Sequence, residues 1–238
     1  MKITNLIAKK SNDLFGEKIP TVAFLGDSVT QGCFALYMKN ERDAEAYYDK
    51  ESAYHLYFSK ILSLLYPRVP INIINAGIGG GRAKNGLERL ERDVLCHHPD
   101  LTVVCFGLND SRDNIDVYYN SLKGIFKALK ENGSEVIFMT PNMMNTKISC
   151  HLKDKPMIDI AEETMKRQND GVLEEFVNIG KTAAREENVV ICDVYSKWKA
   201  LCENGVDTTE LLANKINHPN EKMNWLFAYS LIETIMQN

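Results

Sequence analysis

Residues 21–32 read TVAFLGDSVTQG, and this stretch decides the fold. Residues 21–25 are almost continuously apolar, which is typical of a strand that is buried on both faces of a parallel sheet. Gly26 and Asp27 then favour a tight turn, and Ser28 stands where that turn leads toward a helix. The stretch therefore predicts a buried strand whose carboxyl end presents a serine hydroxyl.

The rest of the chain repeats this order of strand, loop and helix. Further apolar runs predict strands at residues 71–75, 101–106, 135–140 and 189–193. Helical spacing of apolar residues predicts helices at 53–66, 86–96, 115–132, 158–188 and 221–237. The fourth helix is long enough to contain a break, near Gly171 or Gly180. Alternating strands and helices predict right-handed crossovers, and hence an α/β fold: a three-layer α/β/α sandwich with a five-stranded parallel sheet of the flavodoxin-like type.

No linker, internal repeat or shift of composition divides the 238 residues. We therefore predict a single domain over residues 1–238, with residues 1–20 as an N-terminal extension that packs on it. Residues 33–51 are the most loop-like segment, because they include the charged run KNERDAEAYYDKE. Such a segment is either a solvated excursion of the surface or a lid over a site.

Composition excludes several classes of protein. The chain has 28 basic and 32 acidic residues and a net charge of −4, so it lacks the basic footprint of a nucleic-acid-binding protein. Its longest apolar runs fall far below the roughly 18 residues that span a membrane, so no membrane insertion is expected. Six cysteines occur without a CxxC pair, and Cys105 and Cys192 lie inside predicted strands. Reduced thiols and an amino terminus without a signal-peptide core predict a cytoplasmic protein.

Small, polar and nucleophilic residues follow the predicted strands. In an open parallel sheet, ligands bind at the carboxyl ends of the strands. The sequences at those positions are GDSVTQG (26–32), AGIGGGR (76–82), GLND (107–110), PN (141–142) and, just before the last helix, NHPN (217–220). Because these ends meet at one edge of the sheet, their residues are expected to form one site.

The residue types at this edge suit nucleophilic catalysis. A serine needs a neighbouring base to become nucleophilic, and it needs N–H donors for the oxyanion that forms when it attacks a carbonyl. Ser28 points its own N–H toward the same space as its hydroxyl. Glycines after the second strand can bring another N–H close because they have no Cβ, and Asn109 offers a side-chain amide. Of the five histidines, only His218 lies in such a setting.

These blocks together resemble the SGNH (GDSL-like) hydrolase family. The sequence GDS near the amino terminus, a glycine after the second strand, GxND after the third and a late histidine occur in the order of that family. The resemblance extends from Thr21 to the last helix. It implies the SGNH hydrolase fold, with Ser28 as nucleophile and His218 as general base.

The resemblance also implies the donors of an oxyanion hole. Gly80 is the sixth residue of the block NAGIGG, where the family's glycine usually falls, and Gly79 is the alternative. The backbone N–H of Gly80 would join the Ser28 N–H and the side-chain amide of Asn109. Asp27 and Asp110 belong to the motifs and are expected to hold turns as hydrogen-bond acceptors.

The chain departs from the family at the catalytic acid. The family usually has an aspartate three residues before the histidine, and sometimes four, where this chain has Lys215 and Asn214. A cation facing the ring would disfavour the imidazolium, so Lys215 must point away or pair with an acid. We expect a dyad in which a backbone carbonyl or Asn214 orients His218. The alternative is a triad completed by Asp207, or by Glu210.

The function that the resemblance implies is a serine esterase that cleaves a small or carbohydrate-linked ester through an acyl-enzyme. The NHP form of the last block is similar to bacterial relatives that include carbohydrate deacetylases, so an acetylesterase is expected. A lysophospholipase or thioesterase is the alternative enzyme, and a catalytically silent binding protein is the alternative from another class. Arg82 and Arg112 each follow a motif and are candidates to bind a polar substrate, although salt bridges would also account for them.

Two other kinds of site are disfavoured. The glycine run 77–81 could cradle a phosphate, but Arg82 replaces the third glycine of a dinucleotide fingerprint and no GK[ST] occurs. Metal binding is disfavoured because the one close histidine pair, His97 and His98, has diverging side chains. We therefore predict no cofactor and no metal, and an ester substrate as the partner.

Overall fold

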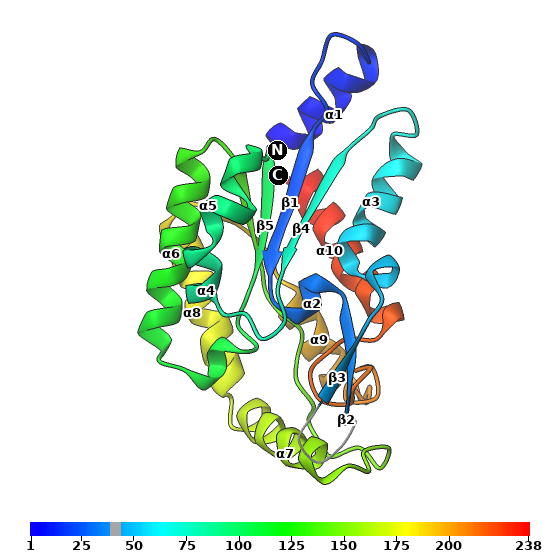
Figure 1. The fold of residues 1–238 in the computed structure, drawn as a ribbon, viewed down its shortest axis with the longest axis vertical. Coiled ribbons are helices and arrows are strands. Elements are labelled where there is room, and N and C mark those ends of the chain that lie inside the picture. Colours follow the sequence, from blue (N-terminus) through cyan, green and yellow to red (C-terminus); the bar gives the residue numbers. More distant parts are fainter. Residues whose placement is uncertain (39–43) are drawn as a thin grey trace.

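The computed structural model describes residues 1–38 and 44–238. Its main sheet consists of β1 (Thr21–Gly26), β4 (Asn72–Gly77), β5 (Leu101–Cys105), β6 (Glu135–Met139) and β7 (Val190–Cys192). The strands are parallel and lie in the order β4-β1-β5-β6-β7. This arrangement confirms the predicted five-stranded parallel sheet of flavodoxin-like order (Figure 1).

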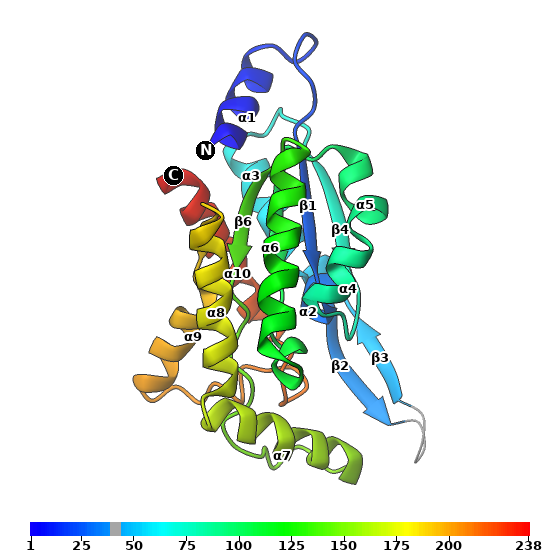
Figure 2. The ribbon, with the colours of Figure 1, turned by 90° about the vertical axis from the view of Figure 1, so that its left-hand side faces the viewer.

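Helices cover both faces of this sheet and make the three layers that were predicted (Figures 1 and 2). The described helices are α1 (Lys2–Asn12), α2 (Ser28–Gln31), α3 (Tyr54–Leu65), α4 (Ala83–Glu88), α5 (Leu90–Asp93), α6 (Ile115–Glu131), α7 (Lys155–Asn169), α8 (Val172–Glu186), α9 (Val194–Glu203) and α10 (Glu221–Gln237). Of these, α2 and α7 lie at the carboxyl end of the strands (Figures 1 and 2). Short 3₁₀ turns, η1 (Lys50–Ser52), η2 (Leu95–His97) and η3 (Asp110–Arg112), lie between them.

The central strands are apolar throughout because they have a core on each side. In β1, Val22 and Phe24 pack in the core that includes residues of α1, α3, α9 and α10, whereas Ala23 and Leu25 pack in the core that includes residues of α4, α5, α6 and α8. Successive side chains of a strand point to opposite faces, so a strand covered on both faces needs an apolar residue at every position. Burial on both faces thus explains the continuous run at residues 21–25.

The long helical stretch predicted at residues 158–188 is divided at Gly171. This glycine has φ of +80° and separates α7 from α8. A residue with a Cβ would be strained at that φ, so glycine favours the change of direction. The predicted break near Gly171 is confirmed, and Gly180 instead lies inside α8, where a Cβ would clash with Phe138 at 2.7 Å.

The first residues of the chain pack on the main core. Ile3 and Ile7 of α1 are buried in the cluster that includes α3 and α10, and the backbone N–H groups of Lys2 and Ile3 donate to the Glu135 carboxylate at the start of β6. The sequence pattern did not predict α1 or α9. Both are amphipathic, and their apolar positions are too few to stand out from polar neighbours.

The described part of the segment at residues 33–51 forms mainly a pair of antiparallel strands rather than a loop. Strands β2 (Cys33–Met38) and β3 (Ala44–Tyr48) pair with each other and project beyond the carboxyl edge of the main sheet (Figure 2). Apolar and aromatic residues at 33–37 and 46–48 favour strands, but the charged run between them dominated the prediction. The part of that run at residues 39–43 lies outside the described residues.

No helix among the described residues has the length and apolarity that a membrane span requires. The six cysteines are unpaired, and Cys105 and Cys192 are buried in strands, as predicted for reduced thiols.

Candidate active site

The loops at the carboxyl edge of the sheet bring the four motif blocks together. Ser28 is the first residue of α2, directly after β1, and Asn109 precedes η3 after β5. Gly80 lies between β4 and α4, and His218 lies two residues before the N-cap of α10. All four line one cavity of about 500 Å³. The fold therefore gathers residues that are up to 190 positions apart in sequence.

Ser28 and His218 form the central pair of this site. The Ser28 Oγ lies 2.8 Å from the His218 Nε2, which is a hydrogen-bond distance. Both residues are buried, with 8% of Ser28 and 3% of His218 exposed. A histidine at this distance can take the proton of the hydroxyl when the serine attacks an electrophile.

The turn that carries Ser28 is fixed by Asp27 and by glycine packing. The Oδ1 of Asp27 accepts from the Val29 N–H at 2.9 Å and so caps α2. A Cβ on Gly77 would lie 2.3 Å from the backbone nitrogen of Gln31, so only glycine lets the end of β4 approach α2 this closely. The position of Ser28 thus depends on the neighbouring strand as well as on its own loop.

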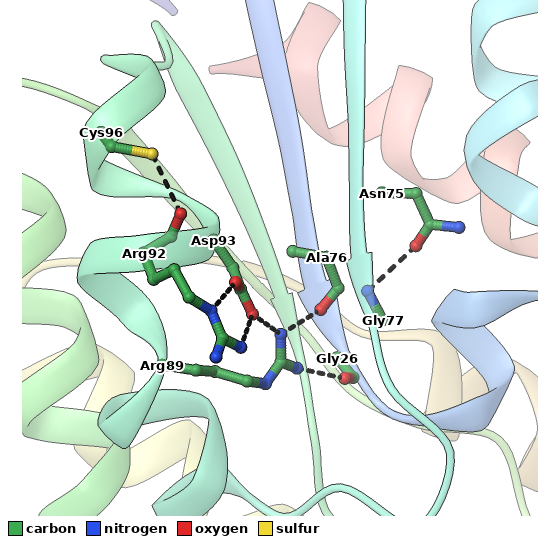
Figure 3. Close-up of polar contacts among 8 residues, drawn as sticks. All are labelled: Gly26, Asn75, Ala76, Gly77, Arg89, Arg92, Asp93 and Cys96. Carbon is green, nitrogen blue, oxygen red and sulfur yellow. Dashed lines mark hydrogen bonds and ion pairs between the residues drawn. The ribbon is translucent and has the colours of Figure 1, made fainter.

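Arg89 ties the carboxyl ends of β1 and β4 together from the other side (Figure 3). Its guanidinium is buried and donates to the carbonyls of Ala76 at 2.7 Å and Gly26 at 3.0 Å, while Asp93 accepts from it at 3.1 Å. Charge-assisted bonds to two strand ends restrain both loops that follow. Arg89 therefore helps to fix the position of the serine turn relative to the glycine loop that follows Gly77.

At the cavity, the backbone N–H groups of Ser28 and Gly80 have no acceptor within the described part of the chain. The φ of +71° at Gly80 is left-handed backbone that favours glycine. The N–H of Gly79, by contrast, donates to the Gln31 Oε1 at 2.7 Å. Gly80 is consequently better placed than Gly79 to donate to an oxyanion.

Asn109 presents its side-chain nitrogen at the same edge. The Nδ2 donates to the Gly81 carbonyl at 3.1 Å and makes a longer contact of 3.5 Å with the Asp27 Oδ2. Both partners are acceptors, so the NH₂ group, and not the amide oxygen, faces them. The first bond orients the amide, and the weakly held second hydrogen is available to an oxyanion.

Asp27 and Asp110 serve as acceptors for backbone N–H groups, as predicted. Asp110 accepts from Ala83 at 2.8 Å and from Gly107 at 3.0 Å, and so links the loops after β4 and β5. Burial raises the pKa of Asp27 to about 7, and burial also raises the pKa of Asp110 to about 6. Both carboxyl groups thus help to hold the loops of the site, and burial favours their neutral form.

Asn214 organises the loop that carries His218. Its Oδ1 accepts from the backbone N–H groups of Ile216, Asn217 and His218, at 3.1, 2.9 and 2.9 Å. These three bonds fix which way the amide points, so its Nδ2 faces the ring. Lys215 has φ of +58°, and its Nζ bonds to the carbonyl and carboxylate of Glu210, which confirms that the cation points away and pairs with an acid.

The ring of His218 has two further partners. The Nδ2 of Asn214 lies 3.3 Å from its Nδ1, and a hydrogen bond of the ring to the backbone of Phe34 in β2 raises its pKa. Burial outweighs this and lowers the pKa of His218 to about 4. An amide donor favours an unprotonated Nδ1, whereas a base that acts through Nε2 requires the protonated Nδ1. The Asn214 amide therefore disfavours the tautomer that the base requires.

Neither Asp207 nor Glu210 supplies the acid that the triad alternative required. Asp207 is 38% exposed and pairs with the Nζ of Lys147 at 2.5 Å. Glu210 accepts from the Ser149 Oγ at 2.9 Å and pairs with Lys215 at 3.0 Å. Both carboxylates are thus satisfied by partners near the surface, and neither contacts the buried ring of His218 among the interactions described.

Of the two arginines predicted to meet a substrate, only Arg112 lines the cavity. Arg82 instead pairs with Asp113 at 2.7 Å, which is the salt bridge that the sequence left open. Arg82 is the N-cap residue of α4, and its side chain turns toward Asp113 at the end of η3 and does not line this cavity.

Several cavity residues were missed by sequence reasoning. Strands β2 and β3 contribute Cys33, Leu36, Ala46 and Tyr48, and α7 contributes Ile160, Glu163 and Arg167. The α7 residues have the spacing of one helical face, but that spacing does not say which site the face borders. In residues 1–38 and 44–238, no three His, Cys, Asp or Glu side chains gather as metal ligands.

Comparison with known proteins agrees with this arrangement. Residues 24–226 match the model of the GDSL-like Lipase/Acylhydrolase family. An acetylxylan esterase of Geobacillus stearothermophilus is 28% identical over 138 residues, which are 53% of this chain. The matched part covers 60% of that relative's length.

Solved structures with the same fold include the acetylxylan esterase of Geobacillus stearothermophilus, with a TM-score of 0.67 and 20% identity over 91% of this chain and 94% of that one. The acetyl xylan esterase AlAXEase has a TM-score of 0.68 and 22% identity over 90% and 99%. A putative GDSL-like lipase from Parabacteroides merdae has a TM-score of 0.70 and 20% identity over 93% and 97%.

Proposed function

Because this chain belongs to the GDSL-like lipase/acylhydrolase family, we propose that it is a serine esterase that removes acetyl groups from a small or carbohydrate-linked ester. The observation that carries this proposal is the 2.8 Å contact between Ser28 Oγ and His218 Nε2, beside the unpaired N–H groups of Ser28 and Gly80. These groups lie at one cavity and are of the kinds that serve as nucleophile, base and oxyanion donors.

The proposed reaction follows from this geometry. His218 takes the hydroxyl proton while Ser28 Oγ attacks the ester carbonyl, and the oxyanion accepts from the N–H groups of Ser28 and Gly80 and from Asn109 Nδ2. The imidazolium then gives its proton to the leaving alcohol, and an acyl-enzyme forms. Water, deprotonated by His218, attacks this acyl-enzyme and releases acetate and free Ser28.

We expect acetyl esters to be cleaved faster than long acyl esters. The relatives that carry a substrate in their names are acetylxylan esterases. A cavity of about 500 Å³ that must also hold the alcohol part leaves limited room for an acyl chain. The measurement is kcat/KM for acetyl, butyryl, hexanoyl and decanoyl nitrophenyl esters, together with acetate release from acetylated xylo-oligosaccharides.

The same panel separates the alternatives. A kcat/KM that climbs steadily from acetyl to decanoyl would favour a lysophospholipase or thioesterase. Turnover of none of these esters, by a folded protein, would favour the binding protein. Each rate is compared with that of Ser28→Ala to remove uncatalysed hydrolysis.

Replacing Asn214 by aspartate should increase kcat about tenfold or more, because a carboxylate orients and stabilises the protonated histidine of a serine triad. One oxygen would keep the three backbone N–H donors that now bind Asn214 Oδ1, and these donors favour the ionised carboxylate. The other oxygen would face His218 Nδ1 in place of an amide donor. The amide donor that disfavours a protonated Nδ1 would then be absent.

The pH profile gives a second readout of the same change. A His218 pKa of about 4 predicts that kcat/KM of the wild type falls only in acid, as the base becomes protonated. A neighbouring carboxylate raises that pKa, so the acid limb of Asn214→Asp should move to higher pH. Asn220→Asp is the matched control, because it adds the same charge at the N-cap of α10, where aspartate is also a good cap. An unchanged kcat and acid limb in folded Asn214→Asp would contradict the proposed role of Asn214.

A further inference from the structure

Two arginine side chains border the cavity beside the proposed catalytic residues. Arg112 ends η3, which follows Asn109, and Arg167 lies on the cavity face of α7. They share one carboxylate, since Glu163 Oε1 lies 3.3 Å from Arg112 Nε and 3.7 Å from Arg167 Nη2. The two guanidinium groups thus face one position, which the Glu163 carboxylate occupies.

The charges around the cavity do not cancel. Among the described lining residues, the side chains that carry a full charge at neutral pH are Arg112, Arg167 and Glu163, which sum to one positive charge. His218 adds none there, because burial holds its pKa at about 4. Glu163 is 54% exposed, so it can turn into solvent at little cost and leave both arginines to another anion.

The guanidinium of Arg167 is largely buried, unlike that of a surface arginine, and it retains a donor that could bind an anion. Only 12% of its side chain is exposed, and its Nη1 donates to the Ser111 Oγ at 2.8 Å. Its buried Nε has no acceptor among the residues that the structure describes. Burial and the nearby charge of Arg112 lower its pKa, so the guanidinium is stabilised less here than in water. A buried charged donor without a partner costs free energy, which a bound anion would offset.

We propose that Arg112 and Arg167 bind a carboxylate or phosphate group on the alcohol part of the ester. This inference rests on the proposed function, in which the acyl group is acetyl and carries no charge, so the anion must belong to the alcohol. Arginine forks bind planar carboxylates and phosphates through paired N–H donors, and Glu163 marks where such a group would lie. The preferred substrate is therefore an acetylated acidic sugar or a similar small anionic alcohol.

A purely structural role for the same ion pairs makes a different prediction. If Glu163 only links η3 to α7, then Glu163→Gln should weaken the link and leave substrate preference unchanged. If Glu163 competes with a substrate anion, then Glu163→Gln should raise the preference for anionic substrates. Arg112→Gln should lower that preference, so the two variants are expected to act in opposite directions.

The test uses three methyl glucosides that are acetylated at the same hydroxyl and differ only at the last carbon. That carbon is a hydroxymethyl group in the first compound, a carboxylate in the second and a phosphorylated hydroxymethyl group in the third. The wild type is expected to cleave at least one anionic compound about tenfold to a hundredfold faster in kcat/KM than the neutral one, at low salt. Each compound is also tested as an inhibitor of nitrophenyl acetate hydrolysis, so that binding without reaction is still measured.

Variants of Arg112 and Glu163 then test whether these residues cause the preference for anionic substrates. Arg112→Gln should reduce the ratio of anionic to neutral kcat/KM about tenfold, and Glu163→Gln should increase it. Arg185→Gln removes one positive charge from the exposed end of α8 and should leave the ratio unchanged. The carboxylate and phosphate compounds show which of the two anions the arginines prefer.

Two failures are distinguishable. Equal cleavage or equal inhibition by the three glucosides, with a ratio that Arg112→Gln and Glu163→Gln do not change, would overturn the anion site and leave the esterase intact. If neither the glucosides nor nitrophenyl acetate were hydrolysed by the folded wild type, the proposed function itself would fail, and the anion site with it.

Discussion

Replacing Ser28 by alanine should abolish ester hydrolysis, with kcat lower by about 10⁵-fold or more. The hydroxyl that lies 2.8 Å from His218 Nε2 would be gone, and no other serine hydroxyl in the described chain has a hydrogen bond to that ring. The variant should still fold, because Ser28 Oγ makes no other hydrogen bond among the described residues. We would measure kcat on an acetyl ester and labelling by a fluorophosphonate probe, which traps an activated serine.

The control for this prediction is Ser63→Ala. Ser63 is an exposed residue of α3 whose hydroxyl bonds only to a carbonyl one helical turn earlier, so labelling and kcat should stay at the wild-type level. Strong labelling of Ser28→Ala, or no labelling of the wild type, would show that Ser28 is not the nucleophile. The esterase proposal would then give way to the binding protein.

Replacing Asn109 by alanine should lower kcat about 10²–10³-fold and change KM much less. Its Nδ2 would bond to the oxygen only when that oxygen carries the negative charge of the tetrahedral intermediate. Loss of a donor of this kind weakens the transition state more than the bound substrate. The measurement is kcat and KM separately, on one acetyl ester, with the unfolding temperature recorded for each variant.

A structural effect of the same substitution can be separated from a chemical one. Asn109 Nδ2 also bonds to the Gly81 carbonyl, so its loss could move the glycine loop. Such a movement would raise KM and lower the unfolding temperature together with kcat. Asn204→Ala, which removes an exposed amide at the end of α9, should change neither. An Asn109→Ala enzyme with wild-type kcat would exclude Asn109 from the oxyanion hole.

Much of the fold could be predicted because its signals are local. A strand with a core on each side must be apolar at every position, and this requirement produced the runs at 21–25 and 101–106. Right-handed crossovers then bring all carboxyl strand ends to one edge. For this reason Ser28, Asn109 and His218 could be expected at one site before any distance was known.

The surroundings of His218 could not be predicted, because they depend on contacts between distant segments. Whether Asp207 reaches the ring depends on where Lys147 lies, and the two residues are 60 positions apart. The backbone of Phe34 belongs to β2, in a segment whose charged run favoured a loop in the sequence. A backbone carbonyl that acts as an acceptor also cannot be recognised from the sequence, because every residue carries the same carbonyl group.

The sequence by itself therefore determined the parallel sheet, the edge that carries the site and the residues able to do nucleophilic chemistry there. Only the tertiary structure decided which groups orient the base and which charges line the cavity. The physical reason is range. Burial patterns and turn chemistry act over a few neighbouring residues, whereas the pairing of Arg112 with Glu163 requires η3 and α7 to be packed together. A helix face such as that of α7 becomes a binding surface only when the fold places it against the catalytic loops.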